Sequence, residues 1–216
     1  MKKLIFCLLS VLLLSCQTLP IIHSEGNETV VCPFPFAEEN YRWVHAIEYR
    51  MPGNLRSSVI GATVIEPATR SVSCAVMTAE GMVLFEADTG PRGLQVKRAL
   101  PPFDSNDVAK KMMEDIELIF LAPQGKPQRG YLSDTAKVCR YSGVSGDWID
   151  VIGEPSSNHV QIRRYSSDGV LTRQVLFADK KKNLYQRIEL QAHDIYSYSL
   201  VMELLEAKRF KKELKR

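Results

Sequence analysis

The chain has 216 residues and a formal net charge of +3; 45% of its residues are hydrophobic and 25% are charged. This composition is that of an ordinary globular protein, and it excludes disordered, collagen-like and polytopic membrane proteins. The small net charge lacks the dense positive surface that a dedicated nucleic-acid binder needs, so we expect no nucleic acid among the partners.

Residues 1–15 have the features of a secretory signal peptide. Two lysines precede an apolar run from Leu4 to Leu14. The run is too short to cross a bilayer, because a membrane-spanning helix needs about 20 apolar residues. It ends in Leu-Leu-Ser-Cys at positions 13–16, which resembles the bacterial lipobox. We therefore predict cleavage after residue 15 and a mature protein that begins with an acylated Cys16.

Acylation would decide where the protein acts. Two or three acyl chains, such as palmitate, give stable anchoring in membrane lipid. Residue 17 is Gln, whereas Asp at that position favours inner-membrane retention in enterobacterial lipoproteins. By this resemblance we expect a lipid-anchored protein of the outer membrane that faces the periplasm. The alternative is an ordinary secreted protein whose signal ends in Ser-Cys by coincidence.

Three regions follow the signal peptide. Residues 16–29 are polar and show no sustained apolar period, so we predict a lipidated N-terminus and a flexible tether. Residues 30–206 are long enough to bury one hydrophobic core, and we predict a single β-rich domain there. Residues 207–216 are rich in Lys and Arg and are predicted to form a solvated basic tail, with contact to anionic lipid as the alternative.

Alternating or short apolar runs between turn residues predict strands along most of the domain. In the first of them, the odd positions from Tyr41 to Met51 are largely apolar and share one face. In chain order the predicted strands are residues 41–51, 59–65, 72–76, 82–85, 94–97, 138–141, 148–152, 160–165, 170–177, 184–190 and 195–205.

One segment after residue 102 breaks the β pattern. Its apolar residues recur at helical spacing, at Val108, Met112, Ile116 and Ile119. Asp104 or Ser105 can accept hydrogen bonds from the free amides of a helix start, and Pro123 cannot continue a helix. We predict an amphipathic helix of about four turns that ends before Pro123.

These elements predict an α+β fold that is mainly antiparallel β. About ten strands cannot stay flat, so we expect a strongly curved, incomplete β-barrel with the helix as a lid or plug. The interior of such a sheet is a natural apolar cavity. The candidate wall residues for ligand binding are Trp43, Ile47, Tyr49, Leu84, Tyr198 and Leu200. The alternative is that they pack against the helix as ordinary core.

Three cysteines remain in the domain, Cys32, Cys74 and Cys139. In an oxidising compartment they allow at most one disulfide, and the sequence leaves all three pairings open. Cys74 lies on an alternating apolar stretch, where a buried free thiol is the expected side chain.

The sequence carries no recognisable catalytic motif. Its histidines form no metal-binding pair, and we find no nucleophile elbow, phosphate-binding loop or dense acidic cluster. His193 and Asp194 are neighbours, which is the ordinary outcome in a turn rather than part of a catalytic triad. We therefore expect no enzymatic activity, no metal and no cofactor.

Several tracts together resemble the LolA/LolB-like outer-membrane lipoproteins. Besides the lipobox, they are residues 81–87, 94–96 and 115–120 and the late strands at 173–177 and 196–204. More narrowly, the chain resembles an uncharacterised lipoprotein branch that is found near aryl-polyene biosynthesis genes. The resemblance implies that residues 30–206 form one LolB-like domain, an incomplete barrel with a helical lid and a cavity for acyl chains.

On this resemblance, we expect the protein to bind acyl chains and to assist lipid or lipoprotein transfer or localisation in the cell envelope. The cargo would be an acyl chain or a lipoprotein, and the periplasmic partner is open. A non-enzymatic scaffold lipoprotein is one alternative, and it predicts a filled interior with an exposed apolar patch. A lipid-modifying hydrolase is the other, and it predicts a histidine bonded to Ser or Asp in a cleft.

Overall fold

The computed structural model describes residues 18–23, 30–53, 55–133, 135–143, 145–154, 157–194 and 197–211. The predicted signal peptide, the predicted acylation site at Cys16 and the end of the basic tail lie outside these residues. Among the helices of the described ranges, none combines the length and the hydropathy that crossing a membrane requires.

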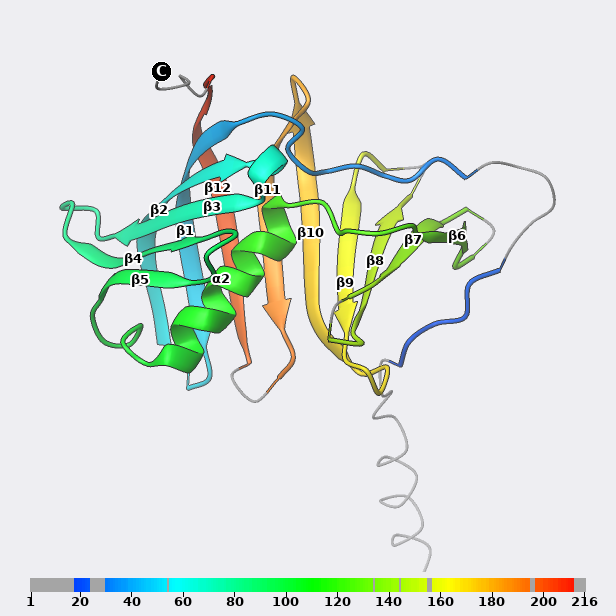
Figure 1. Ribbon diagram of the computed structural model, residues 1–216, viewed down its shortest axis with the longest axis horizontal. Helices are drawn as coiled ribbons and strands as arrows, with labels where there is room; N and C mark the ends of the chain where they lie inside the picture. The colour runs from blue at the N-terminus through cyan, green and yellow to red at the C-terminus, as the bar shows by residue number, and fades with distance from the viewer. Residues whose placement is uncertain are drawn as a thin grey trace, which may run out of the picture.

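The domain is built on one antiparallel sheet of twelve strands (Figure 1). The strands are β1 (Tyr41–Met51), β2 (Leu55–Glu66), β3 (Ser71–Met77), β4 (Val83–Thr89), β5 (Gln95–Ala99), β6 (Gln128–Tyr131), β7 (Lys137–Ser142), β8 (Trp148–Gly153), β9 (Val160–Tyr165), β10 (Leu171–Lys181), β11 (Leu184–Ala192) and β12 (Tyr198–Arg209). A short 3-10 helix, η2 (Pro67–Thr69), separates β2 from β3, and the helix α2 (Asn106–Phe120) separates β5 from β6.

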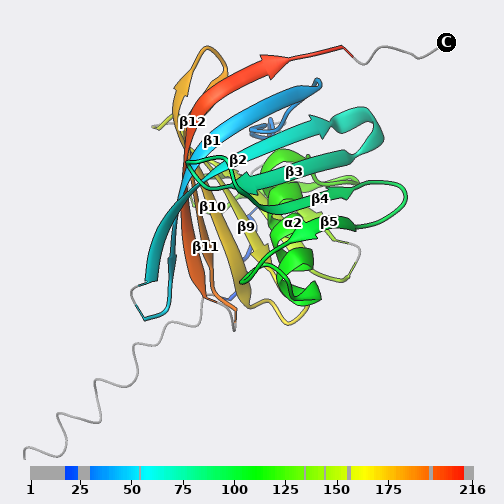
Figure 2. The ribbon, with the colours of Figure 1, turned by 90° about the vertical axis from the view of Figure 1, so that its left-hand side faces the viewer.

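The sheet is strongly curved but does not close on itself (Figure 1). Its strand order is β5-β4-β3-β2-β1-β12-β11-β10-β9-β8-β7-β6, so β1 and β12 pair while β5 and β6 are the two edges. The chain crosses from one edge to the other through α2, which lies in the hollow of the curled sheet (Figures 1 and 2). The mainly antiparallel, open barrel, with one α-helix in the described ranges, is therefore as the sequence predicts.

The number of strands is a correction, because the sheet has twelve strands rather than about ten. The strand that was missed is β6, which lies in a segment that reads as a polar loop. Gln128 and Arg129 are exposed and show no apolar alternation. The strand exists because its backbone pairs with β7, in the register Gln128↔Arg140. Backbone pairing with β7 does not depend on the side chains of β6, so it leaves no apolar pattern in the sequence of this edge strand.

The helix begins and ends where the sequence predicts. The Ser105 side chain accepts a hydrogen bond from the backbone N–H of Val108, and Asp107 favours the positive end of the helix. The helix ends at Phe120, before Pro123. Its buried side chains face the sheet, and they are Ala109, Met113, Asp115, Leu118, Ile119 and Phe120.

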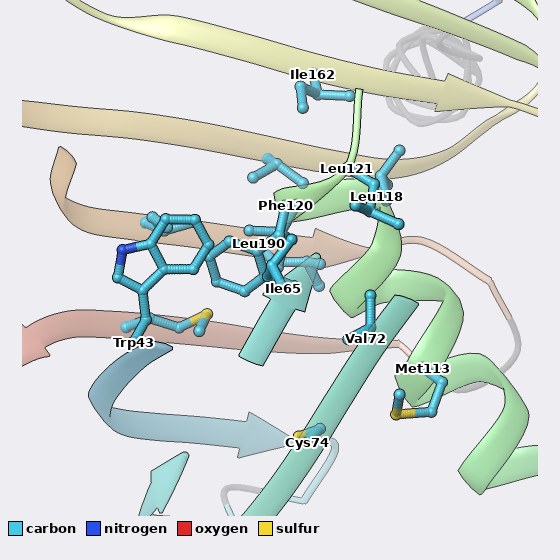
Figure 3. Packing of buried hydrophobic residues seen from close by; sticks show 14 of the residues in the cluster. Trp43, Ile65, Val72, Cys74, Met113, Leu118, Phe120, Leu121, Ile162 and Leu190 are labelled. Atoms are coloured by element: carbon cyan, nitrogen blue, oxygen red, sulfur yellow. The ribbon is translucent and has the colours of Figure 1, made fainter. Parts of the chain in front are cut away.

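The core fills most of the space between α2 and the concave face. Alternate residues of each strand point inward, such as Ile65 and Val72 from β2 and β3 and Ile162 and Leu190 from β9 and β11 (Figure 3). Cys74 is buried among them as a free thiol, as predicted. Burial raises its pKa to about 12, so it stays a neutral, apolar group.

The segment before β1 wraps around the edge strand β6. His23 exchanges two backbone hydrogen bonds with Tyr131 at that edge, and Thr18 bridges to Val170. Cys32 then forms a disulfide with Cys139 of β7. Residues 18–23, which the sequence assigns to a flexible tether, are thus docked on the domain. Polar composition does not reveal this docking because the contacts use backbone groups.

The beginning of the predicted tail is also part of the domain. Residues 207–209 extend β12, where Ala207 is the partner of Trp43 and Arg209 of Tyr41. The Arg209 guanidinium donates to Glu39 across a distance of 2.6 Å. The positive charge of these residues suggested that they are solvated. They form a strand instead because β1 is long enough to pair with them, and the composition of the tail does not reveal this partner.

Candidate ligand-binding site

A pocket of about 250 Å³ opens at the end of the hollow where the β10–β11 turn and the segment before β1 meet. Both lie at the same end of the molecule in Figure 1. Five chain regions form the pocket: the segment 35–39, β1, the end of α2, β10–β11 and β12. The lining residues are Pro35, Phe36, Ala37, Glu38, Glu39, Tyr41, Trp43, His45, Phe120, Phe177, Asn183, Leu184, Tyr185, Ile188 and Leu204.

The burial of the lining residues distinguishes the base of the pocket from its mouth. Glu38, Glu39 and Asn183 are exposed and form the mouth. The base consists of fully buried side chains, and these are Trp43, His45, Phe120, Phe177 and Ile188. The exposed polar side chains therefore lie at the mouth, whereas aromatic and aliphatic side chains with one histidine form the base.

Aromatic stacking fixes the wall of the pocket. The Trp43 ring stacks on Phe120, the last residue of α2, with ring centroids 4.8 Å apart, and Figure 3 shows the two rings side by side. On its other face Trp43 stacks on Tyr41 at 5.2 Å. Phe177 meets Tyr185 edge to face at 5.3 Å. These contacts make a rigid apolar wall between strands that are far apart in the sequence.

Register explains why these residues converge. The inward positions of β1 alternate, so Trp43 and His45 both face the hollow, and β12 places Leu204 opposite His45. On the other side, β10 and β11 pair Phe177 with Ile188. The disulfide of Cys32 ties the segment that leads to residues 35–39 to the sheet. The pocket is thus held by backbone pairing on three sides.

His45 is the polar group at the base. Its side chain is 2% exposed, and its Nδ1 atom has no hydrogen-bond partner among the described residues. The nearest aromatic ring is that of Phe120, with centroids 5.8 Å apart. Burial lowers the pKa of His45 to about 4, because the apolar surroundings disfavour the charged imidazolium. The imidazole is therefore neutral at pH 7.

The six predicted wall residues are only partly brought to this pocket. Trp43 lines it. Ile47, Tyr49 and Leu200 are half-buried on the same concave face and pack against the core beyond the pocket. Neither they nor the other two predicted residues line the pocket itself.

The other two predicted residues have different surroundings. Leu84 is half-buried beside Phe85, and it is Phe85 that takes the fully buried inward position of β4. The pairing of β3 with β4 is irregular between Val76 and Met77. Inward and outward residues therefore do not simply alternate along the apolar run of β4. Tyr198 donates a hydrogen bond from its hydroxyl to Asp115, so its role is to hold the helix.

Sequence reasoning missed most of the lining residues. The sequence placed Phe120 and Phe177 at the ends of predicted elements but did not indicate that they line a pocket. It predicted no element for the segment 35–39. Nothing in the local pattern of α2, β10 or β11 indicates that their aromatic side chains meet. The meeting follows from the strand order, which places β1 between β2 and β12.

A buried ionic network fastens α2 to the concave face. The Arg173 side chain donates to Asp115 at 2.7 Å, and it also contacts Asp194 at 3.1 Å. Lys111 of the helix reaches the same Asp194 at 3.0 Å. Burial raises the pKa of Asp115 above its ordinary value, although Arg173 and Tyr198 favour the charged form. We call Lys111, Asp115, Arg173, Asp194 and Tyr198 the helix latch.

A second hollow of about 620 Å³ lies on the surface between α2 and the β4–β5 turn. Charged side chains such as Arg70, Lys110, Glu114 and Glu117 line much of it. It is an open groove with charged side chains among its lining residues, and it lacks the aromatic base of the first pocket. Within the described part of the chain, no group of three or more His, Cys, Asp or Glu is placed to hold a metal ion.

Comparison with known proteins bears on the fold. No family model and no curated protein sequence matches the chain. Among solved structures, it is similar to a LolA superfamily protein from Nitrosomonas europaea, with a TM-score of 0.56 and 13% sequence identity; the match covers 82% of this chain and 89% of that chain. At this identity the likeness establishes a LolA-like open barrel as the fold.

Proposed function

We propose that this chain is a lipoprotein that binds acyl chains in the Trp43–Phe120 pocket and assists lipid or lipoprotein transfer or localisation in the cell envelope. In this proposal it is one of the LolA/LolB-like outer-membrane lipoproteins, in the branch associated with aryl-polyene biosynthesis. An acylated Cys16 holds it to the outer membrane, facing the periplasm, and it needs no cofactor. The observation that carries the proposal is the aromatic pocket, which the LolA-like fold supports.

The physical case rests on the cost of moving hydrocarbon through water. Each CH₂ group exposed to water costs about 0.8 kcal/mol, so a carrier needs a dry cavity more than it needs chemistry. The burial of Trp43, Phe120 and Phe177 at the base of the pocket supports this role. The pocket volume of about 250 Å³ is below the ~300–1,000 Å³ of usual ligand pockets. A long acyl chain therefore requires α2 to move outward.

The helix latch suits such a movement. The polar contacts of the latch can be exchanged for water when the helix moves, so they add less to the cost of the movement than the buried apolar side chains of α2 do. Lys111 and Asp194 are partly exposed already, with side-chain exposures of 32% and 22%. We propose that α2 is the lid of the site.

A pair of neighbouring residues tests the proposal. Leu204 lines the pocket, while Leu205 lies at the irregularity in the β1–β12 pairing, is 59% exposed and does not line the pocket. Leu204→Asp should weaken the binding of a fluorescent fatty-acid probe by roughly tenfold or more, because a carboxylate is placed in the apolar wall. Leu205→Asp is the matched control and should bind as the native domain does. Equal affinity of both variants, with both folded by circular dichroism, would exclude the pocket as the site.

One observation favours an interaction lipoprotein as the second candidate. Large apolar side chains are exposed along the open edge of the sheet and the nearby turns, namely Met82 at 56%, Leu94 at 38%, Val96 at 43% and Leu100 at 39%. An unpaired edge strand such as β5 can pair with another chain. This candidate predicts a domain that binds no lipid.

A hydrolase has no such support. The histidine of the pocket, His45, has no Ser or Asp bonded to its Nδ1 in the described part of the chain. The proposal therefore assigns no catalytic step, and the lack of enzymatic activity stays a prediction.

A further inference from the structure

The base of the pocket contains a hydrogen-bonding atom that the fold does not use. Nδ1 of His45 has no partner among the described residues, although the side chain is 2% exposed. A buried polar group without a partner costs about 1–3 kcal/mol, so such atoms are uncommon unless a ligand or water pairs with them. His45 lines the pocket, but Nδ1 itself is closed to solvent, so a ligand reaches it once the outward movement of α2 proposed above opens the base.

We propose that His45 selects a ligand whose buried end carries a hydroxyl group, so that the pocket takes a hydroxyl-bearing hydrocarbon end rather than a plain methyl-terminated tail. This inference rests on the proposed function, because it assumes that the pocket binds a lipid.

The chemistry of the base limits the ligand group to a neutral one. The base holds no cation, since its other members are Trp43, Phe120, Phe177 and Ile188. A carboxylate or an ammonium placed there would lose its hydration without gaining a counterion. The charged residues of the site, Glu38 and Glu39, lie at the mouth.

Among neutral groups, a hydroxyl fits the imidazole best. A neutral imidazole has one nitrogen that donates and one that accepts. A carbonyl can only accept, so it requires a proton on Nδ1. A hydroxyl both donates and accepts, so it pairs with Nδ1 in either tautomer. The aromatic rings of Trp43 and Phe120 then surround the hydrocarbon next to the hydroxyl.

Two small probes that differ only in a hydroxyl test this inference, 4-butylphenol and butylbenzene. Binding can be followed by the fluorescence of Trp43 in a Trp148→Phe background, because the chain has two tryptophans. Excitation at the red edge of tryptophan absorption avoids the absorbance of the probes. The measured quantity is the ratio of the two dissociation constants, butylbenzene over 4-butylphenol, in each protein.

We expect this ratio to fall roughly tenfold from the native histidine to His45→Phe, which keeps a flat ring and removes both nitrogens. His45→Gln should retain part of the native preference because its amide also forms hydrogen bonds. If His45→Phe fails to fold, His45→Leu serves as the apolar variant. Thermal unfolding checks each protein before titration.

An unchanged ratio in the folded apolar variant would overturn the inference and leave the proposed function standing, since it would mean that water satisfies the imidazole. If neither probe nor the fluorescent fatty acid binds the native domain, the proposed function itself fails, and the inference fails with it. The two failures are therefore distinguishable.

Discussion

Burial of His45 makes the stability of the domain depend on pH. Its pKa is lowered to about 4 from 6.5 by desolvation. The folded state therefore binds this proton less readily than the unfolded chain does. The neutral histidine costs no stability above pH 6.5, and stability is lost as the pH falls from 6.5 towards 4. Its strand partners are Leu204 and Gly61 and its ring neighbour is Phe120, and none of these residues carries a charge.

We predict that the free energy of unfolding of the native domain falls by ~3 kcal/mol more than that of His45→Gln between pH 7 and pH 4. The other titrating groups are common to both proteins, so their contributions cancel in the difference. Urea unfolding at several pH values measures it. Parallel pH profiles for the two proteins would mean that His45 is protonated without penalty in the folded state.

The sequence could predict which face His45 is on, but not that its Nδ1 atom would lack a partner. The alternation from Tyr41 to Met51 indicates an inward side chain, and β1 confirms it. Whether a buried atom has a partner depends on residues from β12 and α2 that are far away in the chain. For the same reason, three pairings of cysteine were open until the fold placed Cys32 beside Cys139, which lies 107 residues away.

At the scale of elements, the helix latch decides how firmly α2 is held. Arg173 is the only described cation within bonding distance of Asp115, and both side chains are about 5% exposed. Removing one partner of a buried pair leaves an uncompensated charge. Removing both partners together leaves no unpaired charge in this pair, which is often neutral or favourable, although the Tyr198 hydroxyl then loses its acceptor.

We predict that Arg173→Met lowers the free energy of unfolding by about 3–5 kcal/mol and that adding Asp115→Leu restores most of this loss. The control is Arg42→Met, which breaks the exposed pair with Glu206 and should cost at most about 1 kcal/mol. Urea unfolding of the three variants gives the comparison. A loss in Arg173→Met no larger than that of the control would show that the latch does not hold the helix.

Helices and strands could be predicted from the sequence where the local pattern of apolar and polar residues is regular. Ser105 and the helical apolar spacing predicted α2, and alternation predicted the inner face of β1 and β3. The edge strand β6 and the docked residues 18–23 did not follow, because both are held by backbone hydrogen bonds to partners elsewhere. Such contacts are independent of side-chain type and leave no pattern.

At the scale of the whole molecule, Thr18 and the mouth of the pocket lie at opposite ends of β10. Thr18, two residues after Cys16 in the sequence, bridges to Val170 just before β10. Asn183 at the pocket mouth follows the other end of the same strand. Eleven residues of strand span roughly 35 Å. With Cys16 acylated, the mouth would open away from the membrane, where a periplasmic partner can deliver cargo.

The open-barrel architecture could be predicted from sequence, whereas the ligand site could not. Strand patterns and one helix are enough to require a curled sheet. The pocket, however, is made where β1, β10, β11 and the end of α2 converge, and only Trp43 of the six predicted wall residues lines it. These elements converge because β1 pairs with β12, the last strand, and the local sequence patterns do not show this pairing.

The central claim is that the domain carries an acyl chain, and native mass spectrometry with lipid extraction tests it most directly. The domain is purified from the periplasm with Cys16 replaced, so that no anchor lipid contributes to the signal. We predict a stoichiometric acyl-chain ligand that is lost in Leu204→Asp and retained in Leu205→Asp. A ligand-free native domain that also fails to take up a fluorescent fatty acid would contradict the carrier function and leave the interaction lipoprotein as the account to pursue.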